Sequence, residues 1–526
     1  MKRRYSLDSV VVRGRRIFGW GFCLDPERSV KVRSLRLPLE GGGSFDLDVY
    51  ASGLRDDLAE AFPGVPHAAG AGFMVTGRLP SPVGRGTASL VLAGSSECLP
   101  LPGFPEAYVP ATDLPMHRGW DRFRAIARQR GWREAFAAAW RGVGRRIALV
   151  AQPVPPSVLE VGQDAVIVLD HGMGGGANRY RDERIVMHRR GGTPVVLVTS
   201  DLSTLSYRLT FMADGKEEPI ELRLDEQEAV LHLISSLSPR AIEINNLVGY
   251  EDVPSLLAAL VDLRRRSSAL RFRFNLHDFH GLCPSFTLID VSGRHCGVPD
   301  LAACAVCLPV NARFSLGMNA GVNLLEWRRA WAAWLALVDE RVAFSHSAVA
   351  VLARGLPDVA ALAWRIEPHA FDGQGLRPVA SRLDLPVAIV AVGHLNHAKG
   401  AGLLGALARR AEERRLPLRF AVVGTVEGGA VPPSVRVTGA FQRDRLCALL
   451  EAEGTGIALL PSICPETYSY VTDELMATGL PLAVLDLGAP AERVAGYHSG
   501  LLLPTEGLDA QLDALVAFAR RLGAFS

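Results

Sequence analysis

Two glutamates, Glu466 and Glu474, follow the point where a buried strand gives way to a helix. The apolar run 457–460 ends at Pro461, a loop carries Glu466, and the residues behind it have helical spacing. Carboxylates in this place accept hydrogen bonds from ligand hydroxyl groups, and the helix N-terminus beside them can receive a phosphate. The segment therefore predicts either a binding site for such a ligand or an ordinary capping acid followed by a solvated helix residue.

A cation follows another strand of the second half. Gly393 and His394 stand near the end of the run 387–392, and Lys399 and Gly400 precede the next helix. A lysine at such a junction is a sound phosphate ligand, because its charge adds to the positive end of the helix. His394 is only partly protonated near neutral pH, so we expect either a weak phosphate contact or a loop histidine hydrogen-bonded to the backbone.

A glycine-rich loop follows the strand 165–169. Gly174, Gly175 and Gly176 are consecutive and precede a helical stretch. Three glycines let backbone amides approach a ligand closely. The spacing is not that of a dinucleotide-binding loop, so the loop alone does not name its ligand.

A histidine ends another predicted strand of the first half. His277 follows the run 272–274 and has Asp278 beside it. We expect His277 to lie at the same sheet edge as the glycine loop, where it either contacts the ligand or forms a structural pair with the aspartate.

Four of the eight cysteines fall within 25 residues: Cys283, Cys296, Cys304 and Cys307. The last two form the short C-x-x-C spacing that is typical of tetrahedral thiolate sites. A structural zinc ion with all four positions filled is one interpretation, and reduced thiols or disulfides are the other.

The elements that must position these residues are strands alternating with helices. Buried runs at 165–169, 195–198, 242–244, 272–274 and 342–344 form one series, and runs at 387–392, 420–423, 435–437, 457–460 and 482–485 form a second. Apolar strands joined by helices indicate parallel sheets covered on both faces. Because open α/β sheets bind ligands at the carboxyl ends of their strands, we expect a cleft between two doubly wound domains.

The rest of the chain differs in character. Short strand-like runs with Gly- and Pro-rich turns predict a small all-β, sandwich-like domain at 1–110, and residues 111–160 read as a basic helical linker. Between residues 118 and 146 there are nine arginines and two acids, with three tryptophans among them. Such a helix either lies on a membrane surface or packs its aromatic side chains on a neighbouring domain. The α/β domains are expected at 161–375 and 376–526.

Composition narrows the class of protein. The chain has 526 residues and a net charge of only +2, from 57 basic and 55 acidic residues, so a dedicated nucleic-acid binder is not expected. An apolar content of 48% rules out a mainly disordered chain. The sequence shows neither a signal peptide nor a membrane span, which predicts a cytoplasmic protein, either free or peripheral at the inner membrane.

With these motifs in view, the stretch 461–481 resembles the E-x7-E motif of retaining GT-B glycosyltransferases of glycosyltransferase family 4. Residues 487–494 resemble the loop that follows this motif, and Lys399-Gly400 matches the family's Lys-Gly pair, whereas His394 stands where an arginine is usual. The resemblance spans residues 161–526, is strongest from 386 onward, and does not cover the first 150 residues.

The resemblance implies GT-B architecture, with an acceptor-side domain followed by a donor domain. It places Glu466 on the donor sugar, Glu474 on the nucleotide ribose and Lys399 on the diphosphate. It implies the following site: Glu466 and His277 as catalytic residues; Lys399, Glu474, His394, Gly393, Gly400 and Thr467 as donor-binding residues; and Gly174, Gly175 and Gly176 as a loop between donor and acceptor. Catalysis is expected to need no metal ion or other cofactor, since no D-x-D motif stands in the expected place.

The implied reaction is retaining, hexosyltransferase-type transfer from a nucleotide-diphosphate sugar to a glycan or lipid-linked acceptor in surface polysaccharide biosynthesis. UDP-, GDP- and dTDP-sugars all remain open as donors. Two alternatives are a degenerate GT-B scaffold that binds a nucleotide or glycan without catalysis, which His394 favours, and a nucleotide-sugar epimerase of the same architecture.

Overall fold

The computed structural model describes residues 3–13, 15–51, 58, 61–65, 67–95, 97–101, 104, 162–202, 204–213, 219–311, 322–427 and 431–524. By its internal contacts the chain divides into a first unit of residues 1–174, 181–272 and 309–321, and a second unit of residues 175–180, 273–308 and 322–526. The predicted basic helix at 118–146 lies outside the described residues. The boundaries of the four predicted domains stay a prediction.

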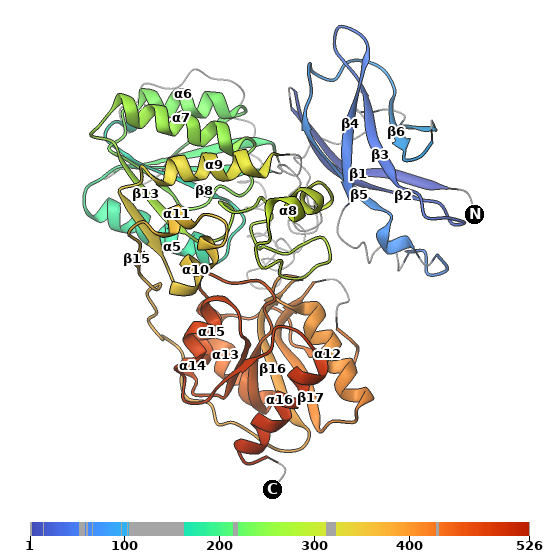
Figure 1. Ribbon diagram of the computed structural model, residues 1–526, viewed down its shortest axis with the longest axis vertical. Coiled ribbons are helices and arrows are strands. Elements are labelled where there is room, and N and C mark those ends of the chain that lie inside the picture. The colour runs from blue at the N-terminus through green and yellow to red at the C-terminus, as the bar shows by residue number, and fades with distance from the viewer. Residues whose placement is uncertain are drawn as a thin grey trace, which may run out of the picture. The chain divides into compact units, whose positions relative to one another are not determined.

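The first unit begins with antiparallel strands. These are β1 (Arg4–Arg13), β2 (Arg16–Leu24), β3 (Val32–Pro38), β4 (Ser44–Ala51), β5 (Gly72–Arg78), β6 (Ala88–Leu92) and β7 (Cys98–Leu101), with a 3-10 turn η1 (Ala68–Gly70) before β5 (Figure 1). They pair in the order β1-β2-β5-β4-β3-β6-β7. On β3, Leu35 and Leu37 are fully buried, while Arg36 between them donates to Asp46 at 2.6 Å, which is the alternation expected of a sheet with one face on a core.

The first unit continues with strands and helices in alternation. These elements are β8 (Val166–His171), α5 (Gly176–Arg190), β9 (Val195–Asp201), β10 (Ser206–Met212), β11 (Ile220–Leu224), α6 (Gln227–Ser236), β12 (Ala241–Ile244) and α7 (Val253–Arg266). The unit boundary falls within α5, whose first turn belongs to the second unit. The strand order is β11-β10-β9-β8-β12, and β8 is parallel to both of its neighbours. The predicted parallel strands of this series are therefore confirmed.

Strands β10 and β11 were not predicted from the sequence, and they extend the sheet in antiparallel fashion. Only residues 202–205 separate β9 from β10, which is too short for the helix of a parallel crossover. Tyr207, Leu209 and Phe211 are buried in alternation with the exposed Arg208. This period of two is the signal of an antiparallel strand with one open face.

The second unit has a first group of elements around three parallel strands. They are β13 (Arg271–Leu276), α8 (Leu301–Cys307), η3 (Leu308–Val310), α9 (Leu324–Leu335), β14 (Glu340–Ala343), α10 (His346–Ala353), α11 (Pro357–Ala360) and β15 (Arg365–Ile366). The first two residues of β13 and the last two of η3 belong to the first unit. β14 is parallel to both β13 and β15. Trp327, Trp331 and Trp334 of α9 are fully buried and fill the core beneath these elements.

The remainder of the second unit is a sheet of parallel strands in the order β18-β17-β16-β19-β20-β21. Its elements are β16 (Val387–Leu395), α12 (Ala401–Glu413), β17 (Leu418–Val426), β18 (Arg436–Val437), η5 (Arg443–Arg445), α13 (Leu446–Ala452), β19 (Thr455–Leu460), α14 (Tyr470–Ala477), β20 (Leu482–Leu485), α15 (Gly488–Val494), β21 (Gly500–Leu503) and α16 (Leu508–Arg521). The second predicted series of strands is confirmed, with β21 in addition.

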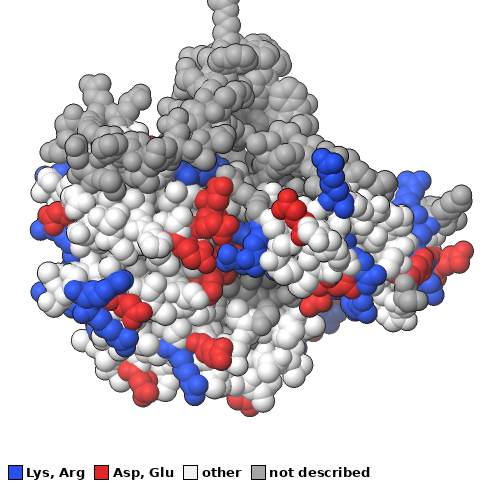
Figure 2. All heavy atoms as spheres, turned by 90° about the horizontal axis from the view of Figure 1, so that it is seen from above, with Lys and Arg blue, Asp and Glu red and all other residues white. Residues whose placement is uncertain are grey.

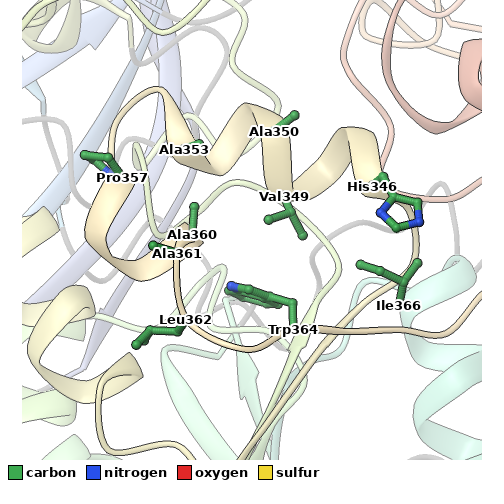
Figure 3. Close-up of a pocket in the computed structure, with 10 residues that line it drawn as sticks. All are labelled: His346, Val349, Ala350, Ala353, Pro357, Ala360, Ala361, Leu362, Trp364 and Ile366. Atoms are coloured by element: carbon green, nitrogen blue, oxygen red, sulfur yellow. The ribbon is translucent and has the colours of Figure 1, made fainter.

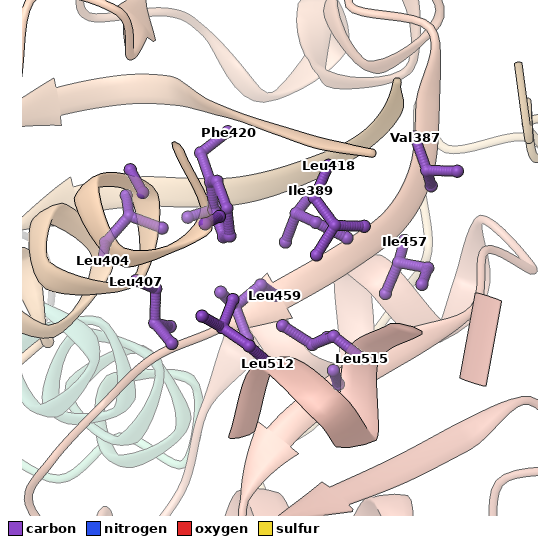
Figure 4. Packing of buried hydrophobic residues seen from close by; sticks show 14 of the residues in the cluster. Val387, Ile389, Leu404, Leu407, Leu418, Phe420, Ile457, Leu459, Leu512 and Leu515 are labelled. Atoms are coloured by element: carbon purple, nitrogen blue, oxygen red, sulfur yellow. The ribbon is translucent and has the colours of Figure 1, made fainter. Parts of the chain in front are cut away.

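Alternate residues of β16 enter two different buried clusters. On one face, Ile389 packs with Leu404 of α12 and Leu512 of α16 (Figure 4). On the other, Val390 belongs to a cluster with Leu446 of α13. Helices thus cover both faces of this sheet, and ligand access is left to its strand ends.

Candidate functional site

The candidate site of the second unit is built where β16 and β19, neighbours in the sheet, reach their carboxyl ends. Lys399 follows β16, Glu466 follows β19, and the lysine Nζ forms an ion pair with Oε2 of the glutamate. Ser462 donates its hydroxyl to the other carboxylate oxygen. The Glu466 side chain is 7% exposed, whereas that of Lys399 is 41% exposed. The structure therefore brings these two predicted residues together and leaves the cation open to solvent.

The contact depends on two loops that approach each other closely. Gly400 takes a left-handed conformation with φ of 79°, and a Cβ at this position would overlap the carbonyl oxygen of Pro461. The backbone amide of Ile463 donates to the carbonyl of Ala398 at 3.0 Å. Gly400 is thus required for the loop after β16 to lie against the end of β19, and this approach places Lys399 beside the glutamate.

Burial and the neighbouring charges act together on the pKa values of Lys399 and of the nearby Cys464. Desolvation is the largest single influence and lowers the pKa of Lys399, but the charge of Glu466, its hydrogen bond to the lysine and a contribution from Cys464 together outweigh it and raise the lysine pKa. Burial, with the same carboxylate nearby, raises the pKa of the adjacent Cys464 to about 12. At neutral pH the lysine is therefore charged and the thiol is neutral. An incoming anion can therefore displace Glu466 as the ion-pair partner of Lys399.

Glu474 lies just over one turn into α14, whose N-cap is Ser469. Its carboxylate is 3.0 Å from Nε of Arg443 and its side chain is 15% exposed. Burial raises the pKa of Glu474, while the charges of Arg443 and Arg179 act in the opposite direction. A half-buried carboxylate held by an arginine is oriented to accept hydrogen bonds from ligand hydroxyls.

Thr467 joins the Glu466 loop to the loop that carries His277. Its hydroxyl donates to the backbone carbonyl of His277 at 2.8 Å. The imidazole of His277 packs edge to face on Tyr180, with 5.1 Å between ring centroids, and tilted on Phe344 at 4.5 Å. Thr467 directly follows Glu466 in the chain, and its hydrogen bond connects His277 to the same loop. The predicted residues His277 and Thr467 are therefore linked to the Lys399–Glu466 pair.

The glycine-rich loop has the backbone that its sequence predicts. Gly174 and Gly175 have φ of 84° and 88°, a region that side chains disfavour. Gly176 opens α5, and a Cβ there would stand 3.2 Å from the ring of Tyr470. The guanidinium of Arg179 lies 4.5 Å from the centroid of the same ring. The first turn of α5 thus packs against the start of α14, close to the segment that bears both glutamates.

The other predicted donor-binding residues lie at the end of β16. Gly393 has φ of 113°, and its carbonyl would overlap a Cβ at Gly424 on the neighbouring strand. His394 is exposed, with Nδ1 2.7 Å from the hydroxyl of Thr425 and Nε2 3.1 Å from a carboxylate oxygen of Glu427. Both ring nitrogens are engaged, so a phosphate contact by His394 requires these bonds to open. Donor binding by Gly393 and His394 stays a prediction.

Three residues at the site were missed by sequence reasoning: Arg443, Arg179 and His369. Arg443 sits in an Arg-Asp-Arg run with no fixed spacing to either glutamate, so nothing in the sequence marks it. Arg179 lies one turn into the helix after the glycine loop, and a basic residue in that place is a usable signal. His369 follows Pro368 in an irregular stretch whose place could only be seen in the fold.

None of the four clustered cysteines is part of a disulfide bond among the described residues. Burial raises the pKa of Cys283 to about 12, and the charges of the other three thiols act in the same direction. The amide of Val298 lies 3.4 Å from Sγ of Cys296. Within the described ranges, no group of three or more His, Cys, Asp or Glu side chains is placed to hold a metal ion. Zinc at this cluster stays a prediction.

Metal analysis tests that prediction. If the cluster binds zinc, the chain purified without added metal should hold about one zinc ion, because four thiolates fill a tetrahedral site. The pair of changes Cys304→Ser and Cys307→Ser should remove the ion, whereas Cys98→Ser, an exposed thiol outside the cluster, should leave it. Clearly less than one ion per chain, together with four thiols that react with a thiol reagent, would favour the free-thiol interpretation.

A separate cavity of about 600 Å³ lies between α10, α11 and the segment that leads into β15 (Figure 3). Its lining is His346, Val349, Ala350, Ala353, Pro357, Ala360, Ala361, Leu362, Trp364 and Ile366. The lining offers one titratable side chain and no converging set of polar groups. Because ligand sites need such groups to orient a substrate, this cavity is a weaker candidate than the strand-end site.

On the face shown in Figure 2, positive and negative side chains of the described residues are interspersed rather than gathered by sign. None of the helices within the described ranges is both long and apolar enough to cross a membrane.

No protein-family model matches the chain. Over 242 residues the chain is 26% identical to a GDP-mannose-dependent alpha-mannosyltransferase from Mycobacterium tuberculosis (strain CDC 1551 / Oshkosh). The match covers 43% of this chain and 59% of that protein, so the chain spans less than two thirds of the curated relative's length.

Three solved structures are among those similar to the chain. Sucrose-phosphate synthase from Thermosynechococcus elongatus has a TM-score of 0.42 at 15% identity, covering 69% of this chain and 92% of that one. The catalytic domain of starch synthase IV from Arabidopsis thaliana, bound to ADP and acarbose, has a TM-score of 0.41 at 11% identity, covering 69% and 93%. Anabaena Alr3699/HepE in complex with UDP has a TM-score of 0.39 at 13% identity, covering 68% and 90%.

Proposed function

We propose that the chain is a retaining GT-B glycosyltransferase that moves a sugar from a nucleotide-diphosphate sugar to a glycan or lipid-linked acceptor. The observation that carries the proposal is the Lys399–Glu466 pair at the carboxyl ends of β16 and β19. A solvent-open cation and a buried carboxylate stand side by side where open parallel sheets bind ligands. This is the charge pattern that a phosphorylated sugar requires.

In the proposed reaction, Lys399 binds the diphosphate and stabilises the charge that develops on the leaving nucleotide. The lysine lies beside the N-terminus of α12, so a helix end and a cation act on the same phosphate group. When the diphosphate takes over the lysine, Glu466 becomes available to hydroxyl groups of the transferred sugar. These groups supply the stabilisation without a divalent cation or other cofactor.

The remaining roles are proposed from the resemblance to glycosyltransferase family 4, together with the contacts of each residue. Glu474, oriented by Arg443, accepts hydrogen bonds from the ribose hydroxyls. Backbone amides of the glycine-rich loop face the space between donor and acceptor, and His277 contacts the sugar. The acceptor hydroxyl attacks from the side of the leaving group while the bond between the sugar and the diphosphate breaks. The hydroxyl proton passes to the departing phosphate oxygen, and the configuration of the sugar is retained.

The mannosyltransferase relative supports the class of donor. Its name gives it a GDP-linked hexose as donor, and the similarity covers 43% of this chain. We therefore propose a hexosyltransferase and take GDP-mannose as the first donor to test, with UDP- and dTDP-sugars beside it.

The proposed setting is surface polysaccharide biosynthesis at the cytoplasmic side of the inner membrane. The basic, tryptophan-containing segment 118–146 would supply the membrane contact, because anionic lipids attract such helices. The N-terminal strands β1 to β7 are proposed to be an accessory domain, and zinc at the cysteine cluster to be structural.

A binding measurement tests the diphosphate site. Calorimetry with UDP, GDP and dTDP, each with and without a chelator, should show one nucleotide that binds irrespective of chelator. Lys399→Ala should weaken that binding by roughly 10–100-fold, since a charge-assisted hydrogen bond contributes about 1.5–3 kcal/mol. Lys31→Ala, an exposed lysine of the β-rich region, is the matched control. Equal affinity in wild type and Lys399→Ala would place the phosphate elsewhere.

One observation favours a second candidate function, a non-catalytic nucleotide-binding scaffold. His394 replaces the expected arginine and is already engaged by Thr425 and Glu427. Tight nucleotide binding with no turnover of any nucleotide sugar would support the scaffold. Conversion of the donor in the absence of an acceptor would instead support the epimerase.

A further inference from the structure

The imidazole of His369 is a buried polar group. The residue is 6% exposed, and neither Nδ1 nor Nε2 has a hydrogen-bond partner among the described residues. Buried polar atoms in folded proteins are nearly always satisfied, so two orphaned nitrogens on one ring are an unusual feature. A ligand that supplies the missing partners would explain why the chain keeps a histidine here.

The ring cannot readily turn to find a partner elsewhere in the chain. It is stacked on Tyr180, with centroids 4.9 Å apart and 27° between planes, and on Tyr468 at 4.2 Å and 23°. Phe344 meets it edge to face at 4.2 Å. Contact with three aromatic rings fixes the plane of the imidazole and leaves its nitrogens the two arrangements that a half-turn of the ring exchanges.

The protonation state of the His369 imidazole indicates which chemical group of a ligand could hydrogen-bond to it. Burial lowers the pKa of His369 to about 3, and the charge of Arg179 acts in the same direction, so the ring is neutral at physiological pH. A neutral imidazole offers one N–H donor and one acceptor nitrogen. A hydroxyl group, which also donates and accepts, matches either nitrogen, whereas a phosphate oxygen only accepts.

The neighbours of His369 come from the segments that form the candidate site. Tyr180 lies just over one turn into α5, Tyr468 lies two residues after Glu466, and the His277 ring is 5.5 Å from that of His369, centroid to centroid. We infer that His369 is a further binding residue of this site and hydrogen-bonds a hydroxyl group of the transferred sugar. The inference rests on the proposed function, and it places His369 beside His277 and Glu466 on the sugar rather than on the nucleotide.

The test compares His369→Phe with wild type. Phenylalanine keeps the stacking and removes both nitrogens, so the melting temperature should stay equal or rise, because a buried unsatisfied group is lost. Affinity for GDP-mannose or UDP-glucose, whichever the wild type binds, should fall about tenfold. Affinity for the corresponding GDP or UDP, which lack the sugar, should not change. His498→Phe, an exposed histidine, is the control.

Two further variants assign the nitrogen. The amide of His369→Asn reaches the place of Nδ1 and that of His369→Gln the place of Nε2, so partial recovery in one of them supports a direct hydrogen bond. Unchanged sugar-nucleotide affinity in His369→Phe would overturn the inference. So would a lower melting temperature with equal losses for nucleotide and nucleotide sugar, which marks a structural role. If wild type binds no nucleoside diphosphate at all, the proposed function itself fails.

Discussion

Glu466→Ala is expected to remove nearly all sugar transfer while leaving the fold intact. The carboxylate is buried beside Lys399 and in the proposed reaction meets the hydroxyl groups of the sugar. Loss of one preorganised polar contact at a reacting centre lowers turnover by about 10²–10³-fold. Stability should change by only about 1 kcal/mol, since water can replace the carboxylate at the 41% exposed lysine.

The affinity of Glu466→Ala for the nucleotide should not fall with its transfer activity. In the free protein Glu466 and a diphosphate compete for the same ammonium group, so removal of the carboxylate should leave GDP or UDP affinity unchanged or tighter. Steady-state transfer assays and calorimetry on one preparation measure both effects. Glu506→Ala removes an exposed carboxylate from the loop after β21 and should change neither. Unimpaired transfer by Glu466→Ala would remove this residue from the site.

Much of the fold could be predicted because buried parallel strands leave a plain pattern. The run 387–392 is apolar at every position, since β16 packs on helices at both faces, and the structure confirms it. The hairpin of β10 and β11 was not predicted because it lacks this continuous apolar pattern. Its alternating pattern, with Tyr207 buried and Arg208 exposed, differs from the continuous apolar runs by which the other strands of this sheet were identified.

Some residues of the candidate site could be predicted from the sequence and others could not. Lys399 and Glu466 each follow a strand directly, so the parallel sheet brings them to one edge and their proximity could be anticipated. Arg443 and His369 reach the site from irregular segments whose course depends on tertiary packing. Glu474 could be placed on its helix, but its arginine partner could not be inferred, because no spacing along the chain relates the two residues.

Gly400→Ala is expected to have the largest effect on stability of the changes considered for this site. The backbone at Gly400 has φ of 79°, a conformation that costs an alanine about 1–2 kcal/mol. The new Cβ would also overlap the carbonyl of Pro461, so one of the two loops must move. We expect a total loss of about 3 kcal/mol or more and a melting temperature lower by roughly 5–10 °C. The movement should separate Lys399 from Glu466 and weaken nucleotide binding as well.

Gly402→Ala is the matched control, because the same chemical change two residues further along meets different surroundings. Gly402 lies within α12, and a Cβ there has nothing within 4 Å. Alanine is the better helix former, so this variant should gain between zero and about 1 kcal/mol. Thermal melts of the two variants thus separate the demand for glycine at Gly400 from a general effect of added volume. Equal stability of Gly400→Ala and wild type would show that the loop after β16 can relax away from Pro461. The close approach would then not be what holds Lys399 beside Glu466.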